Sequence, residues 1–127
     1  FELNKIVRAN VLKLKPYSSA RDEFQGVASV YLDANENPNS TDYNRYPDPH
    51  QLKLKEKISF IKHVPVNQIF LGNGSDEPID LLIRACCEPG VDNVVIPQPT
   101  YGMYTVSAEI NNVKIKNIAL TESFDLD

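Results

Sequence analysis

The sequence has no apolar run long enough to cross a membrane. Its longer ones, such as Val94-Val95-Ile96 and Leu81-Leu82-Ile83, fall far short of the roughly 20 residues that a membrane-spanning helix needs. The opening residues, Phe1 to Lys5, contain no charged stretch leading into an apolar core, which argues against a secretory signal there. We therefore expect no membrane role. The chain does not begin with methionine, which leaves room for an upstream segment.

Cysteine and histidine are also scarce. The two cysteines, Cys86 and Cys87, are adjacent, which suits neither an ordinary disulfide nor the spacing of a zinc pair. We interpret them as buried or half-buried thiols in a protein of the reducing cytoplasm, because free cysteine behaves mostly as a small hydrophobe. Neither His50 nor His63 has a partner at the spacing of metal ligands, so no metal site is expected.

The charge balance argues against a nucleic-acid surface. The chain carries 13 basic and 17 acidic residues, a net charge of -4, and its basic residues are scattered among carboxylates instead of forming a stripe. With 42% hydrophobic and 9% aromatic residues, the composition is that of an ordinary globular domain. The sequence contains no internal repeat and no low-complexity stretch.

The character of the sequence changes near residue 50. Residues 1–49 are irregular, with a short helix expected around Ile6 to Leu12, a short strand over Val30-Tyr31-Leu32, and a loop dense in Asn, Pro, Asp and Ser. From Asp48, which can cap a helix, the pattern becomes regular. We therefore predict two parts, an amino-terminal arm over residues 1–49 and an α/β region over residues 50–127.

The second part predicts alternating helices and strands. In order, the expected elements are a helix with Leu54, Ile58 and Ile61 on one face, a strand over residues 68–71, a helix burying Ile79, Leu82, Ile83 and Cys86, a strand over residues 93–96, a helix over about residues 101–110, and a strand around Val113 and Ile115. This order favours a largely parallel sheet with helices packed on it. Such sheets bind ligands beyond the carboxyl ends of their strands, so the loops after Leu71 and Ile96 are the informative ones.

The first of these loops, Gly72-Asn73-Gly74-Ser75-Asp76-Glu77, suits an anion. Glycine allows a sharp turn, the first amides of the following helix lack partners, and the helix dipole favours negative charge there. The loop lacks the third glycine of a dinucleotide fingerprint and the Gly-Lys-Ser/Thr of a nucleotide-triphosphate loop. A plain N-capped helix with acidic residues in its first turn explains the same pattern, so both interpretations stay open.

The second loop, Pro97 to Tyr104, carries an aromatic residue to the same edge of the sheet. Its prolines stiffen the turn that holds Tyr101. An aromatic face beside a phosphate site suits a flat phosphorylated ring, which stacking favours by about 1 kcal/mol beyond simple burial. The alternative is that Tyr101 and Tyr104 only pack a helix.

Five segments, in this order and at these separations, carry a resemblance to a known family. They are Leu14-Lys15-Pro16-Tyr17-Ser18-Ser19-Ala20-Arg21, Leu32-Asp33-Ala34-Asn35-Glu36-Asn37-Pro38, Arg45-Tyr46-Pro47-Asp48, Gly72 to Glu77, and Pro99-Thr100-Tyr101-Gly102-Met103-Tyr104. The sequence resembles the histidinol-phosphate aminotransferase family of pyridoxal-phosphate (PLP) enzymes, from about residue 6 to the last residue.

The resemblance implies a fold-type-I aminotransferase. The chain would then be an irregular amino-terminal arm with substrate-side loops, followed by the truncated first β-α-β-α-β part of a three-layer, parallel-sheet PLP-binding large domain. The family acts as a homodimer with active sites at the subunit boundary. Its small-molecule reaction converts histidinol phosphate and 2-oxoglutarate to imidazole-acetol phosphate and glutamate in histidine biosynthesis.

The resemblance also implies residue roles for the cofactor. Gly74, Ser75 and Asp76 would hold the PLP phosphate at the helix start. Tyr101 would stack on the pyridine ring, and Tyr46 would reach the cofactor phosphate of the partner subunit.

On the substrate side, the resemblance implies a role for Tyr17 near the phosphate or imidazole end, and for Asn35 with Glu36 along the wall of the site. No catalytic residue is expected in this chain, because the family's Schiff-base lysine, the acidic partner of the pyridine nitrogen and the arginine for the substrate carboxylate all lie downstream. We therefore expect this chain alone to be inactive.

Three other interpretations stay open. A small α/β module could bind a phosphorylated metabolite without doing chemistry. A structural remnant could pair with a complete subunit through its first 49 residues. Within the aminotransferases, an aromatic amino acid could be the substrate, because the phosphate loop serves PLP and not the substrate.

Overall fold

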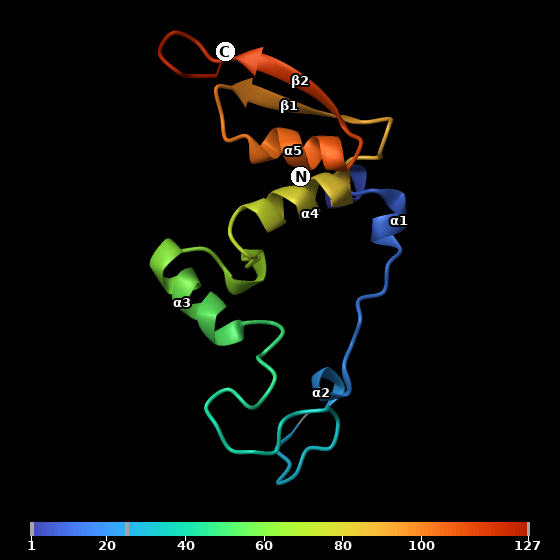
Figure 1. Cartoon of the computed structure of the whole chain (residues 1–127), viewed down its shortest axis with the longest axis vertical. Helices are drawn as coiled ribbons and strands as arrows, with labels where there is room; N and C mark the ends of the chain where they lie inside the picture. The colour runs from blue at the N-terminus through green and yellow to red at the C-terminus, as the bar shows by residue number, and fades with distance from the viewer. Residues whose placement is uncertain (1, 25, 127) are drawn as a thin grey trace. The chain divides into compact units, whose positions relative to one another are not determined.

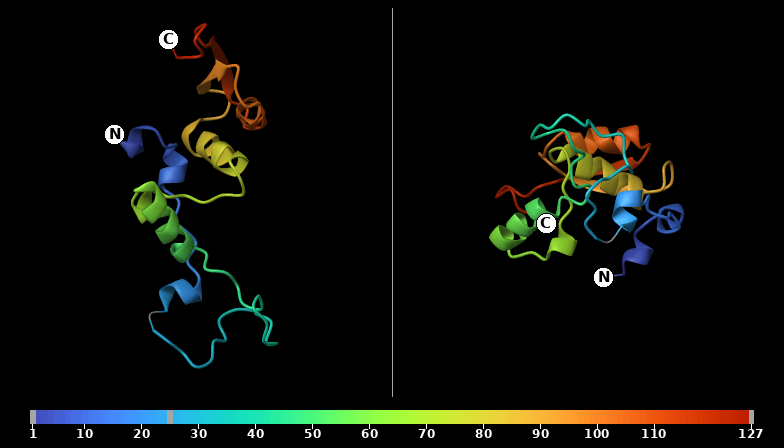
Figure 2. Two further views of the ribbon diagram at one scale, coloured as in Figure 1. Left: turned by 90° about the vertical axis from the view of Figure 1, so that its left-hand side faces the viewer. Right: turned by 90° about the horizontal axis from the view of Figure 1, so that it is seen from below.

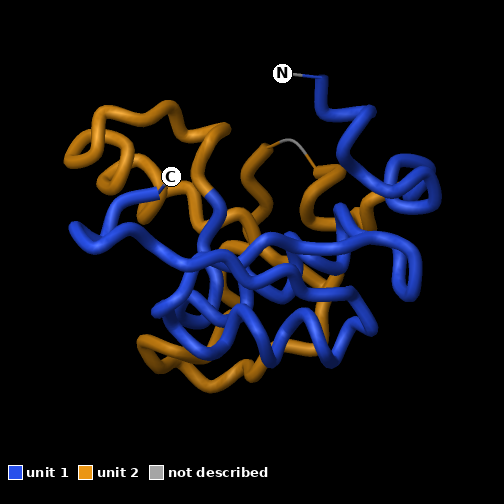
Figure 3. The backbone as a smooth tube through the Cα atoms, turned by 90° about the horizontal axis from the view of Figure 1, so that it is seen from above, with its two compact units in different colours: residues 1–14, 70–127 blue, residues 15–69 orange. Residues whose placement is uncertain are grey.

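The structure, a computed structural model, describes residues 2–24 and 26–126. The chain forms two compact units, of which unit 1 comprises residues 1–14 and 70–127 and unit 2 comprises residues 15–69 (Figure 3). The division predicted from the sequence at residue 49 lies inside unit 2 and stays a prediction.

Unit 1 is built around a pair of parallel strands. β1 (Asn93–Gln98) and β2 (Lys114–Ala119) pair in register from Asn93 opposite Lys114 to Gln98 opposite Ala119. The connection between them contains α5 (Met103–Ile110), which lies alongside the strands (Figures 1 and 2). The predicted parallel α/β arrangement is therefore confirmed for this β-α-β unit, and β1 runs two residues further than expected.

α4 (Asp76–Cys86) packs against α5 and completes a small core. The buried residues of this core are Ile83, Ala108 and Val113, and the partly buried Ile79, Cys87, Val94 and Ile115 pack against them. Ala108 is completely buried, because helix and sheet approach each other closely at that point. The expected burial of Leu82 is wrong, since this side chain is 65% exposed among the described residues.

The amino-terminal segment docks on the carboxyl end of α4. It contains the 3-10 helix η1 (Leu3–Lys5) and the short α1 (Ala9–Leu12), in place of the longer helix predicted from Ile6. Between them, the backbone N–H of Arg8 donates to the carbonyl of Ala85 at 2.9 Å. The Arg8 guanidinium donates to the carbonyl of Arg84 at 3.0 Å and pairs with Glu88 at 2.9 Å. Arg8 therefore satisfies backbone carbonyls that the last turn of a helix leaves unpaired.

Unit 2 contains two α-helices and long irregular stretches. Its helices are α2 (Ala20–Glu23), α3 (Leu52–Lys62) and the 3-10 helix η2 (Val66–Gln68). Before α3, the Asp48 carboxylate accepts from the backbone N–H groups of His50 and Leu52, both at 2.8 Å, as expected for a residue that starts a helix. α3 itself buries no residue among those described, so its apolar side chains pack on little.

Two predicted strands, over residues 30–32 and residues 68–71, are wrong. Neither stretch forms a strand, and within the described residues only β1 and β2 pair. An extended segment becomes a strand only when a neighbour receives its hydrogen bonds, and these two have none here. No helix in the described part of the chain is long and apolar enough to span a bilayer.

The adjacent thiols Cys86 and Cys87 are both free and half-buried, as the sequence suggested. Burial is the largest cause that raises the pKa of the Cys87 thiol, followed by the negative charge of Asp92. Cys87 packs against the core of unit 1, which is the behaviour of a small hydrophobe.

Candidate functional site

The glycine loop of unit 1 is organised by a carboxylate from the helix that follows it. Gly74 has a φ of 70°, a left-handed conformation that glycine adopts without strain. The Glu77 carboxylate turns back and accepts from the backbone N–H of Asn73 at 2.6 Å and from its side-chain amide at 3.1 Å. Glu77 therefore fixes the start of the loop and leaves the residues after Asn73 to bind a ligand.

The second carboxylate of that helix turn holds an aromatic residue. The Tyr101 hydroxyl donates to Asp76 Oδ1 at 3.0 Å, which joins the loop after β1 to the start of α4. This hydrogen bond is the largest cause that raises the pKa of the Tyr101 hydroxyl, followed by burial and the charge of Asp76. Tyr104 packs against the Tyr101 ring edge to face, with centroids 6.4 Å apart.

These contacts leave hydrogen-bond donors exposed at the start of α4. Gly74 and Ser75 are exposed, and the Ser75 hydroxyl makes no capping bond to the helix, so its side chain is available. The first backbone amides of an α-helix have no intrahelical partners and attract negative charge. Both nearby carboxylates are occupied by their own donors, which reduces their repulsion of an anion. The donors fit a phosphate, and Tyr101, 54% exposed, offers a ring beside it.

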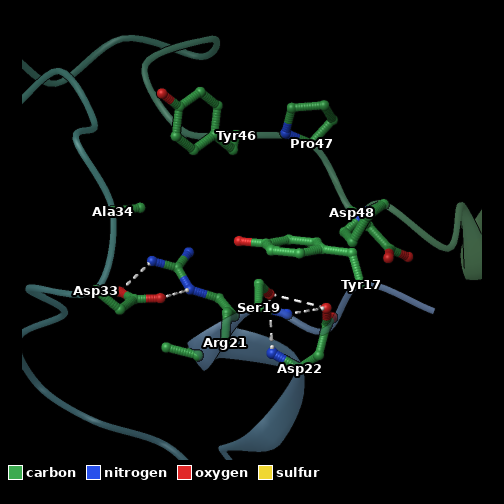
Figure 4. Close-up of a pocket in the computed structure, with 11 residues that line it drawn as sticks. Tyr17, Ser19, Arg21, Asp22, Asp33, Ala34, Tyr46, Pro47 and Asp48 are labelled. Atoms are coloured by element: carbon green, nitrogen blue, oxygen red, sulfur yellow. Dashed lines mark hydrogen bonds and ion pairs between the residues drawn. The ribbon is translucent and has the colours of Figure 1, made fainter. Parts of the chain in front are cut away.

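Unit 2 contains a separate pocket with a volume of about 710 Å³. It is lined by Tyr17, Ser19, Ala20, Arg21, Asp22, Asp33, Ala34, Tyr46, Pro47, Asp48 and Pro49. Figure 4 shows the Tyr17 ring lying across the middle of the pocket, with Tyr46 and Pro47 on one side of it and Ser19 and Arg21 on the other. An exposed aromatic ring next to a guanidinium group and a hydroxyl suits a small polar ligand with a flat part.

A short helix positions the arginine of this pocket. Ser19 and Asp22 form a capping box, in which the Ser19 side chain accepts from the Asp22 backbone N–H and the Asp22 carboxylate accepts from the Ser19 backbone N–H. Arg21, in the first turn of α2, pairs with Asp33 through two hydrogen bonds of 2.7 Å (Figure 4). This pairing is the largest cause that lowers the pKa of the Asp33 carboxyl.

Sequence reasoning missed both α2 and the role of Arg21. The sequence Ser-Ala-Arg-Asp has the spacing of a capping box, and this signal predicts a helix start at Ser19. Arg21 also pairs with Glu36 at 3.4 Å and lies 4.8 Å from the centroid of the Tyr31 ring.

The predicted site residues fall into two groups. Unit 1 brings Asp76, which follows Gly74 and Ser75, into contact with Tyr101, but the glycine loop follows no strand, so the two loops do not share a sheet edge. Whether they bind PLP stays a prediction.

Unit 2 holds the other four predicted residues. Tyr17 and Tyr46 line the pocket, and the Asn35 carbonyl lies 3.5 Å from the Tyr46 hydroxyl. The Glu36 side chain is only 3% exposed and faces two arginines. Their roles toward a substrate also stay predictions. Among the described residues, no group of three or more His, Cys, Asp or Glu side chains is placed to hold a metal ion.

Acid should loosen unit 2. In the folded chain the pKa values of four carboxyls lie below their ordinary values, those of Asp22, Asp33, Glu36 and Asp48, with hydrogen bonds as the largest cause in each. Because the folded values lie below the unfolded ones, these groups stabilise the fold above about pH 4 and lose that effect as pH falls through the folded values. We expect the protection of amides over residues 32–46 of the whole protein, measured as the exchange rate relative to the intrinsic rate at the same pH, to fall at acid pH.

The control for this prediction removes the titrating groups. The double variant Asp33→Asn/Glu36→Gln should exchange faster already at pH 7 and should respond less to acid than the unchanged protein. Exchange profiles that respond equally to acid in both proteins would show that other groups carry the effect.

Comparison with known proteins agrees with the motifs. The family model for aminotransferase class I and II matches residues 11–127. The chain is 62% identical over 99% of its length to the histidinol-phosphate aminotransferase of Parabacteroides distasonis, and 60% identical over 96% to that of Bacteroides thetaiotaomicron. It is 57% identical over its whole length to the enzyme of the same name from Christiangramia forsetii. The chain spans 36% to 37% of the length of these relatives.

The resemblance seen in the five sequence segments is thus confirmed, since the similarity covers nearly every residue and includes the glycine loop, Tyr101 and the pocket of unit 2. The chain belongs to the class I and II aminotransferases.

Proposed function

We propose that the whole protein is a PLP-dependent aminotransferase that converts histidinol phosphate and 2-oxoglutarate to imidazole-acetol phosphate and glutamate. The observation that carries the proposal is the joining of the glycine loop to an aromatic ring by the Asp76–Tyr101 hydrogen bond of 3.0 Å. The substrate assignment is supported by relatives named histidinol-phosphate aminotransferase at 57% to 62% identity.

The cofactor phosphate would bind at the start of α4. Gly74, Ser75 and Asp76 would contribute backbone amides there, and the Ser75 hydroxyl would add a further donor. Glu77 would keep the loop in shape through its bonds to Asn73. Tyr101 would lie against the pyridine ring, held in place by the hydrogen bond that its hydroxyl donates to Asp76.

When bound, PLP supplies a ring that withdraws electrons from the substrate carbon that loses its proton. The residues of this chain bind and orient, and the group that moves the proton would be a lysine from the rest of the protein. The neutral Tyr101 ring serves as a flat apolar surface, so it would fix the plane of the cofactor without taking a proton.

The pocket of unit 2 would form the substrate side. Tyr17 would approach the phosphate or imidazole end of the substrate, and Asn35 with Glu36 would belong to the wall around it. We also propose that the protein is a homodimer in which Tyr46 reaches the cofactor phosphate of the partner subunit. The β1–β2 pair would then be part of the larger sheet of a fold-type-I large domain.

The experiment that tests this function is mass spectrometry of the whole protein after incubation with PLP and borohydride reduction. We expect one pyridoxyl group, fixed covalently to one lysine. Absence of a site-specific adduct, together with binding of a phosphate ester, would instead favour a module that binds a phosphorylated metabolite without chemistry. Amino transfer to 2-oxoglutarate from histidinol phosphate, compared with transfer from phenylalanine and tyrosine, then decides the substrate.

A further inference from the structure

The Glu36 carboxylate of unit 2 is almost completely enclosed by protein. Its side chain is 3% exposed although the surrounding loop is open. One oxygen accepts from the Tyr46 backbone N–H at 2.9 Å and from Arg21 at 3.4 Å. The other accepts from Arg45 at 2.9 Å and from Arg21 at 3.5 Å. Every lone pair of this carboxylate faces protein, so it has little capacity to bind a ligand as well.

These contacts fix the main chain at Tyr46. Residue 46 belongs to no helix or strand, so no regular ladder holds its backbone N–H. The hydrogen bond from the Tyr46 backbone N–H is the largest cause that lowers the pKa of the Glu36 carboxyl, because it stabilises the charged form. Next to it, the Asn44 side chain donates to the Asn37 carbonyl at 3.1 Å and closes the base of the loop between them.

Glu36 also reaches the opposite wall of the pocket through Arg21. Arg21 lines the pocket from α2, whereas Tyr46 lines it from the loop that follows Arg45. Arg21 is held independently by Asp33, so it is a firm support for the carboxylate. Two parts of the wall that are 25 residues apart in sequence are therefore joined by one side chain.

We propose that Glu36 is a positioning residue that acts on ligand affinity through Tyr46 and does not touch the ligand. The inference rests on the proposed function only in naming PLP as the ligand that Tyr46 contacts. In this inference Glu36 does not contact the substrate directly. It controls the position of the Tyr46 ring.

A double-mutant cycle in the whole protein tests the proposal. Glu36→Gln should weaken PLP binding about tenfold, because its amide oxygen accepts a weaker, uncharged hydrogen bond from the Tyr46 N–H and its NH2 group cannot accept from Arg45. In Tyr46→Phe the contact that Glu36 serves is already lost, so Glu36→Gln/Tyr46→Phe should bind PLP as Tyr46→Phe does. Glu23→Gln, which changes a carboxylate of α2 outside these contacts, should bind PLP as the unchanged protein does.

If the losses of PLP affinity caused by Glu36→Gln and by Tyr46→Phe multiply in the double variant, the inference is wrong, whereas the proposed function is unaffected. If Glu36→Gln does not fold, Arg45→Gln takes its place in the cycle, because Arg45 is 58% exposed and its loss leaves the Tyr46 bond in place but less well oriented. We then expect Arg45→Gln to cause a smaller loss of PLP affinity, and to cause none when Tyr46→Phe is already present. A loss that persists in the Tyr46→Phe background would overturn the proposal.

A second measurement does not depend on the cofactor. Hydrogen exchange of the Tyr46 backbone amide, measured without PLP, should be about tenfold faster in Glu36→Gln than in Glu23→Gln. If the whole protein takes up no PLP, the proposed function fails, and this exchange still decides the inference: equal rates in the two variants would refute it.

Discussion

Tyr101→Ala in the whole protein should weaken PLP retention about tenfold or more if Tyr101 has the proposed stacking role, because the ring and its stacking energy are lost. The side chain is 54% exposed in this structure, so a ligand can reach its ring without rearrangement of the fold. The measurement is the PLP dissociation constant, determined by titrating the cofactor-free protein and following the absorption of the bound form.

Tyr101→Phe separates the ring from the hydroxyl. It keeps the stacking surface but removes the bond to Asp76, so we expect PLP affinity within a few-fold of the unchanged protein. If Phe weakens binding as much as Ala, the anchoring hydroxyl matters and the ring does not. Unchanged binding by Tyr101→Ala would remove the stacking role altogether.

Gly72→Ala should destabilise the glycine loop by about 1–3 kcal/mol, the usual cost of overpacking. A methyl group at position 72 would stand 2.8 Å from Pro78 Cδ and 3.1 Å from the Glu77 carboxylate. The Pro78 ring is rigid and belongs to the first turn of α4, so the loop must move away from the helix start. We expect a lower midpoint of thermal unfolding and weaker PLP binding in the same variant.

Two further variants make this prediction specific. Gly102→Ala adds a methyl group with no atom within 4 Å at a φ of -62°, so it should change stability by about 0.5 kcal/mol or less. Gly72→Ala/Pro78→Ala removes the ring that the new methyl group meets and should recover most of the lost stability. Failure of this second change to rescue the first would mean that the cost arises elsewhere in the loop.

The sequence predicted unit 1 better than unit 2, for a physical reason. The apolar spacing of Ile79, Ile83 and Cys86 specifies one face of a helix, and that face meets the core through Ile83. Leu82 has the same spacing with Ile79 and Cys86, yet it stays exposed because no described element covers its side of α4. Periodicity identifies a helix, whereas burial depends on what the helix packs against.

The strand predictions were wrong where strand formation depends on pairing with another segment of the chain. Residues 93–96 and residues 68–71 have similar apolar composition, but only the first has a neighbour, β2, to receive its hydrogen bonds. In unit 2 the extended stretches are held by side chains instead of ladders. Such pairings, between residues with long separations in sequence, leave no periodic signal.

The candidate site shows the same division. The glycine loop and Tyr101 do lie close together, through the Asp76–Tyr101 hydrogen bond, but the strand over residues 68–71 from which their shared sheet edge was predicted does not form. The bond from Tyr101 to Asp76, and the turn of Glu77 back to Asn73, depend on rotamers and were beyond sequence reasoning. The buried carboxylate of Glu36 was equally hidden, because its charge predicts a surface position.

The docking of Arg8 on the end of α4 has a consequence for the order of events during synthesis. Arg8 and its partner Glu88 are 80 residues apart, so the segment around Arg8 is synthesised well before the surface on which it docks. At translation rates of about 5 to 20 residues per second, about 4 to 16 s pass between the synthesis of Arg8 and that of Glu88. During that interval the carbonyls of Arg84 and Ala85 do not yet exist, so Arg8 cannot make these hydrogen bonds until α4 has been synthesised.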